Sequence, residues 1–96
     1  MKIKHLVVGP FLTNCYLLTS KDECAVIDPG EEGNRILKEI KRTRAKPKYI
    51  INTHFHPDHT SKNLKIKDKT RAKILIHGEE KNFINFEVDK FLKEGD

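Results

Sequence analysis

The sequence predicts an α/β fold with a mixed sheet of about five strands and two or three helices. Short apolar runs bounded by turn residues recur along the chain and indicate strands. One segment with apolar residues at helical spacing, residues 32–44, lies between two of these runs. A strand–helix–strand succession implies a parallel crossover with at least one covered face. The 96 residues suffice for one small domain, so we expect residues 1–96 to form a single domain.

The first three predicted strands precede this helix. Residues 2–8 form the first strand, which stops at a Gly-Pro pair. Residues 15–18 and 25–27 are two more apolar runs, and the polar turn at 20–23 between them predicts a hairpin. The sequence Asp-Pro-Gly at 28–30 then ends this part of the sheet.

The predicted helix at 32–44 carries one apolar stripe. The stripe consists of Ile36, Leu37 and Ile40. Two glutamates at 31–32 suit the positive end of the helix dipole. The proline at 47 marks the end of the helical segment, and residues 49–51 form a fourth strand.

The second half of the chain predicts one more helix and one more strand. Residues 60–69 form a polar helix whose only apolar anchors are Leu64 and Ile66, and residues 74–76 form the fifth strand. The last fifth of the chain is too apolar for a disordered tail. Its apolar residues are Phe83, Ile84, Phe86, Val88, Phe91 and Leu92. We expect these side chains to need a covering layer, which makes the domain incomplete.

The composition indicates a folded chain with a small core. Hydrophobic residues make up 36%, and adding the five glycines leaves the share below the roughly 45–50% of globular chains. The net charge is +5, from 19 basic and 14 acidic residues. The closest approach to a basic block is Lys62, Lys65, Lys67 and Lys69, interrupted by Asp68. This spread of lysines favours a solvated helix surface over a nucleic-acid partner.

Neither cysteine is expected to form a disulfide or to bind a metal ion. Cys15 and Cys24 would not lie opposite each other in the predicted hairpin, and neither has a second cysteine at metal-ligand spacing. Both are expected to be small buried hydrophobes in a reducing compartment. No apolar run approaches the roughly 20 residues that span a bilayer, and residues 1–5 lack the apolar stretch of a signal peptide. We therefore expect a cytoplasmic protein that does not enter membranes.

Three of the five histidines lie close together, next to an aspartate. In extended backbone, His54 and His56 point to the same side and can hold one divalent cation. Asp58 and His59 follow where the chain turns into a helix, and they can reach a second cation. A two-metal site with nitrogen and carboxylate ligands activates water and stabilises the leaving oxygen. Zinc suits these ligands best, with iron and manganese as alternatives.

Each of these residues also has a purely structural interpretation. A lone histidine at a strand end is usually a surface or capping residue, and Asp58 could cap the helix that follows. The hydroxyl of Thr53 could satisfy a local backbone group. The combined pattern His-x-His-x-Asp-His after an apolar strand favours the metal site over these separate interpretations.

Residues 53–59, Thr-His-Phe-His-Pro-Asp-His, resemble the signature of the metallo-β-lactamase superfamily. Residues 9–18 and 25–30 resemble the opening strands of its glyoxalase II-like (hydroxyacylglutathione hydrolase-like) branch. Residues 46–51 and 72–77 continue the likeness. The resemblance implies that the chain is the N-terminal half of an αββα sandwich.

This resemblance also implies the roles of the site residues. The implied ligands are His54 and His56 for the first metal ion and Asp58 and His59 for the second, in a site that holds two zinc ions when complete. Asp58 would also be catalytic, because it orients the hydroxide that attacks the substrate. Asp28 and Thr53 would support the site. The di-iron oxygen-reducing relatives carry glutamate at the position of His56, so hydrolysis is favoured over redox chemistry.

The sequence departs from the family pattern in several places. The family's complete site takes further histidines and a bridging aspartate from the second half of a fold of about 200 residues. His5 and His77 lie outside the ligand motifs and are expected to be structural. Residues 61–62 are Ser-Lys where the family usually has a glycine pair. Arg71 occupies a position that favours left-handed backbone.

The sequence therefore predicts a metal-dependent hydrolase of a small-molecule thioester or ester. Two alternatives stay open: a truncated or relict metal-binding or interaction module without catalysis, and a phosphodiesterase or nuclease relative. The chain could also be a natural short protein that forms a homodimer, each copy covering the open face of the other. A fragment of a longer hydrolase would be a monomer.

Overall fold

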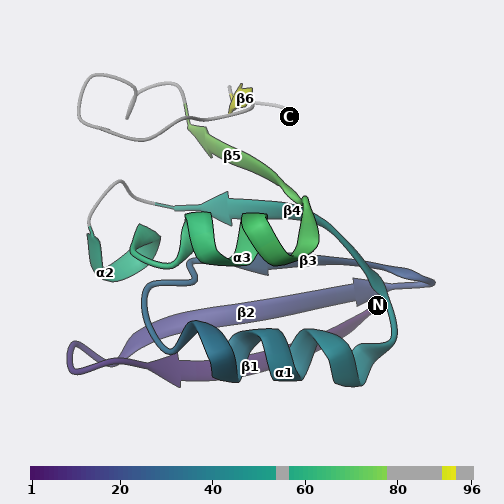
Figure 1. The fold of residues 1–96 in the computed structure, drawn as a ribbon, viewed down its shortest axis with the longest axis horizontal. Coiled ribbons are helices and arrows are strands. Elements are labelled where there is room, and N and C mark those ends of the chain that lie inside the picture. The colour runs from purple at the N-terminus through teal and green to yellow at the C-terminus, as the bar shows by residue number, and fades with distance from the viewer. Residues whose placement is uncertain (54–56, 78–89, 93–96) are drawn as a thin grey trace.

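The computed structural model describes residues 1–53, 57–77 and 90–92, which form one mixed sheet with helices α1 to α3. The strands are β1 Lys2–Val8, β2 Thr13–Ser20, β3 Glu23–Ile27, β4 Lys46–Asn52, β5 Lys73–His77 and β6 Lys90–Leu92. The helices are α1 Gly33–Thr43, α2 Pro57–Thr60 and α3 Asn63–Thr70. The strands lie in chain order across the sheet (Figure 1). The predicted α/β fold is confirmed, and β6 is a further strand that the sequence did not indicate.

The sheet combines an antiparallel and a parallel part. β1, β2 and β3 are antiparallel neighbours, whereas β3 to β6 run parallel to one another. The turn between β2 and β3 pairs Ser20 with Glu23, as the polar residues at 20–23 predicted. The chain passes through α1 between β3 and β4, which confirms the predicted parallel crossover.

The two cysteines lie at different levels of this antiparallel part. Cys15 pairs with Leu6 on β1, and Cys24 pairs with Thr19 on β2. Both cysteines are free and buried, as predicted. Burial, together with the nearby Asp28 carboxylate, raises the pKa of Cys15 to about 12, and burial also raises the pKa of Cys24. Both thiols are therefore protonated near neutral pH and pack as small hydrophobes.

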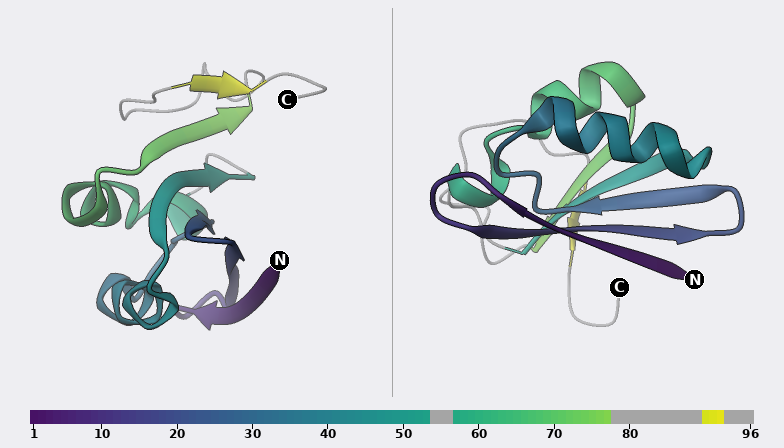
Figure 2. Two further views of the ribbon diagram at one scale, coloured as in Figure 1. Left: turned by 90° about the vertical axis from the view of Figure 1, so that its right-hand side faces the viewer. Right: turned by 90° about the horizontal axis from the view of Figure 1, so that it is seen from below.

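Helices α1 and α3 lie on the same face of the sheet and enclose the core against it (Figure 2). The innermost helix residues are Ile36, Ile40 and Ile66. On β1, Leu6 and Val8 are buried beneath the helices while Val7 between them is exposed. The predicted apolar stripe of α1 is confirmed, with Leu37 partly buried at its margin. No helix within the described ranges is long and apolar enough to cross a membrane.

The predicted helix at 60–69 corresponds to α3, which begins three residues later, and a short turn separates it from α2, which ends at Thr60. Ile66 is 0% exposed, as expected of an anchor, but Leu64 is 54% exposed, so the predicted role of Leu64 as an anchor is wrong. Two residues correspond to about 200° around an α-helix, which places Leu64 on the side opposite Ile66. Asn63 lies three residues from Ile66 and is buried with it. Arg71 closes α3 with a left-handed φ of 62°, as its position predicted.

The second face of the sheet carries exposed apolar side chains. Ile3 and Val7 on β1 and Tyr49 on β4 are exposed. Strand alternation directs them away from α1 and α3. Among the elements that the structure describes, no helix covers this face (Figure 2). The apolar side chains of the last fifth of the chain, predicted to need a covering layer, lie outside the described part.

Candidate metal centre

The predicted supporting residues Asp28 and Thr53 lie at the carboxyl ends of β3 and β4. These strands are parallel neighbours in which Ile27 pairs with Ile51. The backbone N–H of Asp28 donates to the carbonyl of Ile51 at 3.0 Å, so Asp28 lies level with the end of β4. Asp28 has a left-handed φ of 57°, which turns the chain out of the sheet. The carboxyl ends of parallel strands are where open α/β sheets bind ligands.

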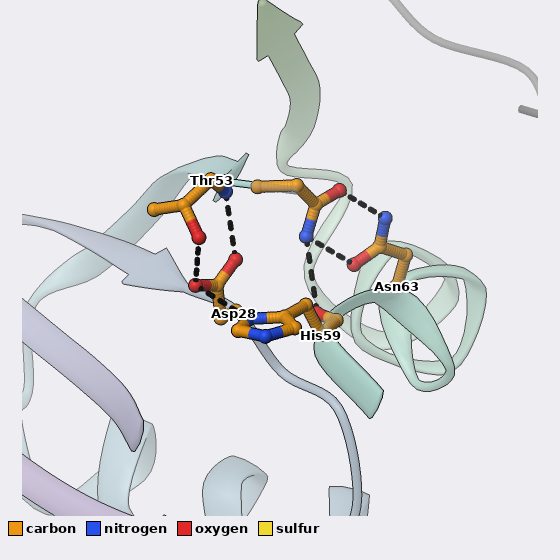
Figure 3. A network of polar contacts seen from close by, with 5 residues as sticks. Asp28, Thr53, His59 and Asn63 are labelled. Atoms are coloured by element: carbon orange, nitrogen blue, oxygen red, sulfur yellow. Dashed lines mark hydrogen bonds and ion pairs between the residues drawn. The ribbon is translucent and has the colours of Figure 1, made fainter. Parts of the chain in front are cut away.

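The buried carboxylate of Asp28 joins Thr53 to His59 (Figure 3). The backbone N–H of Thr53 donates to Oδ1 at 2.8 Å, and its hydroxyl donates to Oδ2 at 2.6 Å. Nδ1 of His59 lies 3.0 Å from the same Oδ2. A buried carboxylate needs partners of this kind to offset its lost hydration. The Thr53 hydroxyl thus donates to the Asp28 carboxylate. The purely structural interpretation, in which this hydroxyl satisfies a local backbone group, did not include that contact.

The Asp28 carboxylate lies at ion-pair distance from Nδ1 of His59. With the ring proton on Nδ1, toward the carboxylate, the lone pair of the ring is on Nε2. Histidines that bind metal ions in proteins usually donate their other ring N–H to a carboxylate in the same way. The side chain of His59 is 24% exposed and that of Asp28 only 5%, so the ring lies between a buried anion and the surface. This arrangement fits a metal ion at Nε2.

The other predicted ligands lie wholly or partly outside the described structure. Asp58 is part of α2, directly before His59, and its side chain lies outside the described part. His54 and His56 are themselves outside the described residues. Within the described ranges, no three histidine, cysteine or acidic side chains gather at metal-binding distances. The assignment of these four ligands therefore stays a prediction.

Two buried asparagines next to the centre were missed by the sequence interpretation. Asn52 ends β4 with 2% of its surface exposed, and Asn63 begins α3 with 1% exposed. Asn52 Nδ2 donates to Asn63 Oδ1 at 3.1 Å, and Asn63 Nδ2 donates to Asn52 Oδ1 at 2.6 Å. Asn52 Nδ2 also donates to the carbonyl oxygen of His59 at 3.2 Å. Strand alternation was the available signal, since it places Asn52 on the core-facing side with Ile50, where a polar group needs a buried partner.

A cavity of ≈ 560 Å³ lies at the opposite end of the sheet. Its lining includes Lys2, Lys4, Leu17, Lys21, Glu39 and Arg42. These residues come from the start of β1, the end of β2, the turn after it and the last turns of α1. The cavity is therefore separate from the predicted metal centre at the carboxyl ends of β3 and β4.

The histidines outside the motif lie in strands. His5 Nε2 is 2.7 Å from Asn14 Oδ1, and its ring stacks on Tyr16 with the ring centroids 4.8 Å apart. These contacts agree with the structural role expected of His5. His77 ends β5, and its side chain lies outside the described part.

Comparison with known proteins identifies the family. The sequence model of the metallo-beta-lactamase superfamily matches residues 8–94, and the chain belongs to that superfamily. The probable metallo-hydrolase YqgX of Bacillus subtilis is 37% identical over 84 residues, which cover 88% of this chain and 40% of that protein. The hydroxyacylglutathione hydrolase GloC of Haemophilus influenzae is 29% identical over 85 residues, with the same two shares of 88% and 40%.

A solved structure confirms the predicted fold class. The crystal structure of TTHA1623 in a di-iron-bound form matches this chain with a TM-score of 0.84 at 22% identity, covering 97% of this chain and 55% of that one. The chain thus has the architecture of one half of this fold, and it spans about two fifths of the length of the curated relatives named above. The superfamily fold implies metal ions, and the identity of the metal stays a prediction for this chain.

Proposed function

We propose that this chain supplies the first half of the two-metal centre of a hydrolase that cleaves thioesters or esters. The observation that carries the proposal is the 3.0 Å contact between the Asp28 carboxylate and Nδ1 of His59 at the ends of β3 and β4, which suits a cation at Nε2. The choice of a thioester is supported by the relative named hydroxyacylglutathione hydrolase.

The proposal gives each motif residue a role. The ligands are His54 and His56 for the first metal ion and Asp58 and His59 for the second. Zinc suits this set best, with iron and manganese as alternatives. When bound, the two ions would activate water at neutral pH and stabilise the charge that develops on the substrate. Asp58 would orient the attacking water toward the substrate carbonyl.

The supporting residues prepare His59 for this role. The two hydrogen bonds from Thr53 hold the Asp28 carboxylate in one orientation. The carboxylate in turn lies 3.0 Å from Nδ1 of His59, where it orients the ring so that Nε2 can meet a metal ion. The described residues therefore fix the direction of one ligand before an ion binds, which reduces the entropy lost on binding.

A complete active site needs more ligands than these four. A catalytic zinc ion usually has three protein ligands and a water molecule. The chain spans about two fifths of its curated relatives, so the activity of a whole enzyme is a proposal for this chain. The alternative of a metal-binding module without catalysis predicts metal uptake without turnover. The alternative of a nuclease relative predicts RNA or DNA binding that weakens as salt is raised.

The first test is the number of metal ions bound per chain, measured by elemental analysis of the purified 96-residue protein. Its native mass is measured on the same sample. His59→Ala removes a proposed ligand, whereas His5→Ala removes a histidine of the same sheet outside the motif. We expect His59→Ala to lose most of the bound metal and His5→Ala to retain it. Equal metal content in the His59→Ala variant and the unchanged chain would contradict the role of His59.

Hydrolysis of a hydroxyacylglutathione thioester by the metal-loaded chain tests the activity. Turnover that requires both metal and His59 supports the hydrolase, and metal uptake without turnover supports the non-catalytic module.

The native mass distinguishes a homodimer from a monomer. A tight dimer supports a second copy on the open face with Ile3, Val7 and Tyr49, whereas a monomer supports a fragment of a longer hydrolase.

A further inference from the structure

Two buried asparagines connect β4, α2 and α3 next to the proposed metal centre (Figure 3). Asn52 uses its whole carboxamide: Nδ2 donates to Asn63 Oδ1 and to the His59 carbonyl, and Oδ1 accepts from Asn63 Nδ2. A carboxylate can only accept hydrogen bonds, and a hydroxyl has a single proton to donate. Only an amide side chain of this length can therefore make the contacts that Asn52 makes.

His59 is held through both its side chain and its backbone. Asp28 at the end of β3 lies 3.0 Å from Nδ1 of the ring, and Asn52 at the end of β4 donates to the backbone carbonyl. Because β3 and β4 are adjacent parallel strands, Asp28 and Asn52 both hold His59 from the same edge of the sheet. Helix α2 has 4 residues, too few to keep a helical conformation by itself. The direction of the His59 ring therefore depends on these two anchors.

Asn63 acts one step further from the centre. Its carboxamide binds both polar atoms of the Asn52 carboxamide, at 3.1 and 2.6 Å. This double contact prevents rotation of the Asn52 amide and directs Nδ2 at the His59 carbonyl. Both side chains are almost completely buried, so water does not replace either contact without a change in the packing.

We propose that Asn52 is a positioning residue of the metal centre and that Asn63 sets its orientation. Asn52 fixes the backbone of His59 relative to β4, while Asp28 fixes the ring. Without the Asn52 anchor, α2 shifts on the end of the sheet, and Nε2 of His59 leaves the place where it meets the ion. The inference rests on the proposed function, in which His59 is a metal ligand.

The test compares metal affinity with stability in the full chain. The double variant Asn52→Leu/Asn63→Leu replaces both amides by apolar side chains of similar size, so neither amide is left without the other, and the His59 carbonyl loses the donor under test. Thr70→Val is the matched control, because it removes a hydroxyl that donates to Ile66 on the same helix, α3, far from His59 along the chain. Co²⁺ titration gives the dissociation constant, and urea unfolding of the metal-free chain gives the stability.

We expect the double variant to bind Co²⁺ about 10- to 100-fold more weakly, the usual range for residues that orient a ligand. The Thr70→Val variant is expected to bind within about twofold of the unchanged chain at comparable stability, since surface and partly buried changes of this kind act locally. Unchanged Co²⁺ affinity in a folded double variant would overturn the inference. Equal loss of affinity in Thr70→Val would overturn it as well.

Single alanine variants decide the question if the double variant does not fold. Asn52→Ala removes the anchor itself, whereas Asn63→Ala removes only the residue that orients it. A positioning role predicts that Asn52→Ala loses more Co²⁺ affinity than Asn63→Ala for the same loss of stability. Losses of affinity that follow stability alone in both variants would show a purely structural pair and overturn the inference.

A measurement on the metal-free chain separates this inference from the proposed function. Nitrogen NMR of the His59 ring at a fixed pH of about 8, above the usual histidine pKa, reports which nitrogen carries the proton. We expect the Nδ1-protonated form to dominate in the unchanged chain and to lose its dominance in the double variant. If the unchanged chain takes up no Co²⁺, the proposed function fails for this chain. The NMR measurement of the His59 tautomer is then the only test of the inference about Asn52. A tautomer population that the double substitution leaves unchanged then overturns the inference, and a changed population supports it.

Discussion

The two ends of the sheet differ in what holds their polar side chains. At the carboxyl ends of β3 and β4, Asp28 and Asn52 are buried and hydrogen-bonded to partners from other elements. At the opposite end, the cavity is lined by long cationic side chains, among them Lys4 and Arg42, and Arg42 forms an exposed ion pair with Glu39. The first end has a fixed arrangement of short side chains, whereas the second has a hollow surrounded by long, flexible ones.

This difference favours the end with Asp28 and His59 over the hollow as the functional end of the chain. Ordering an exposed lysine or arginine costs up to about 2 kcal/mol of side-chain entropy, so such a lining does not fix a ligand by itself. Short buried side chains lose little conformational entropy when a ligand binds. Each hydrogen bond among them also holds the neighbouring side chain in one orientation. A metal centre needs ligands that are already in place, and of the two ends, as the described residues form them, the one with Asp28 and His59 has such an arrangement. Substitutions at both ends test this interpretation.

Asp28→Asn is expected to have the largest effect. The amide keeps the shape of the side chain, but its NH₂ group faces Nδ1 of His59 and moves the ring proton to Nε2. Metal affinity should fall by about 10- to 100-fold, and the free energy of unfolding should fall by about 2 kcal/mol as a buried charged hydrogen bond is lost. Metal titration and urea unfolding measure the two quantities. The control is Asp22→Asn in the exposed β2–β3 turn, and an equal loss of affinity in the control would contradict the prediction.

Thr53→Val is expected to have a smaller effect at the same end. It removes the hydroxyl that donates to Asp28 at 2.6 Å and keeps the backbone donor at 2.8 Å. The loss of one charged hydrogen bond should cost about 1.5 kcal/mol of stability and about 10-fold in metal affinity. The control is Thr19→Val beside the cavity, which should leave metal affinity unchanged. If Thr53→Val and Thr19→Val bind metal with equal affinity, the end with Asp28 supports metal binding no more than the cavity end does.

High pH should destabilise the chain through Cys15, which lies near Asp28. Burial raises the pKa of Cys15 to about 12 in the folded chain from the ordinary 9.0, so the folded state holds this proton more tightly than the unfolded one. The stabilisation is complete below pH 9 and is lost as the pH rises from 9 toward 12. At pH 10 the loss should be about 1 kcal/mol, measured by urea unfolding between pH 8 and 10. The Cys15→Ala variant should lose less stability over this range, and identical slopes would contradict the prediction.

Lys4→Ala at the cavity is expected to have the smallest effect. An exposed lysine away from buried partners contributes within about 0.5 kcal/mol to stability, because solvent hydrates its charge in both states. Metal affinity should not change. A destabilisation above about 1 kcal/mol in urea unfolding, or a loss of bound metal, would show that the cavity end contributes to the centre.

Several features of the fold followed directly from the sequence. The apolar run that ends at a Gly-Pro pair predicted the strand at 2–8, and the stripe of Ile36 and Ile40 predicted a helix within a residue or two of its observed ends. Predictions failed where the local pattern was weak. Leu64 is apolar but points outward. The strand β6 has 3 residues and was not predicted. It is recognised as a strand through its pairing with β5, which a local sequence pattern does not contain.

The sequence by itself determined the parallel crossover, the unpaired cysteines, the histidine motif and the superfamily, because each depends on residues close together in the chain and on their spacing. The metal ligands, the choice of zinc, the cytoplasmic location and the homodimer stay predictions. Only the tertiary structure decided what supports the centre. Thr53 meets Asp28 across 25 residues of chain, and Asn63 meets Asn52 across 11. Such contacts exist only after β3, β4 and α3 have packed together, and no local pattern of the sequence contains that packing.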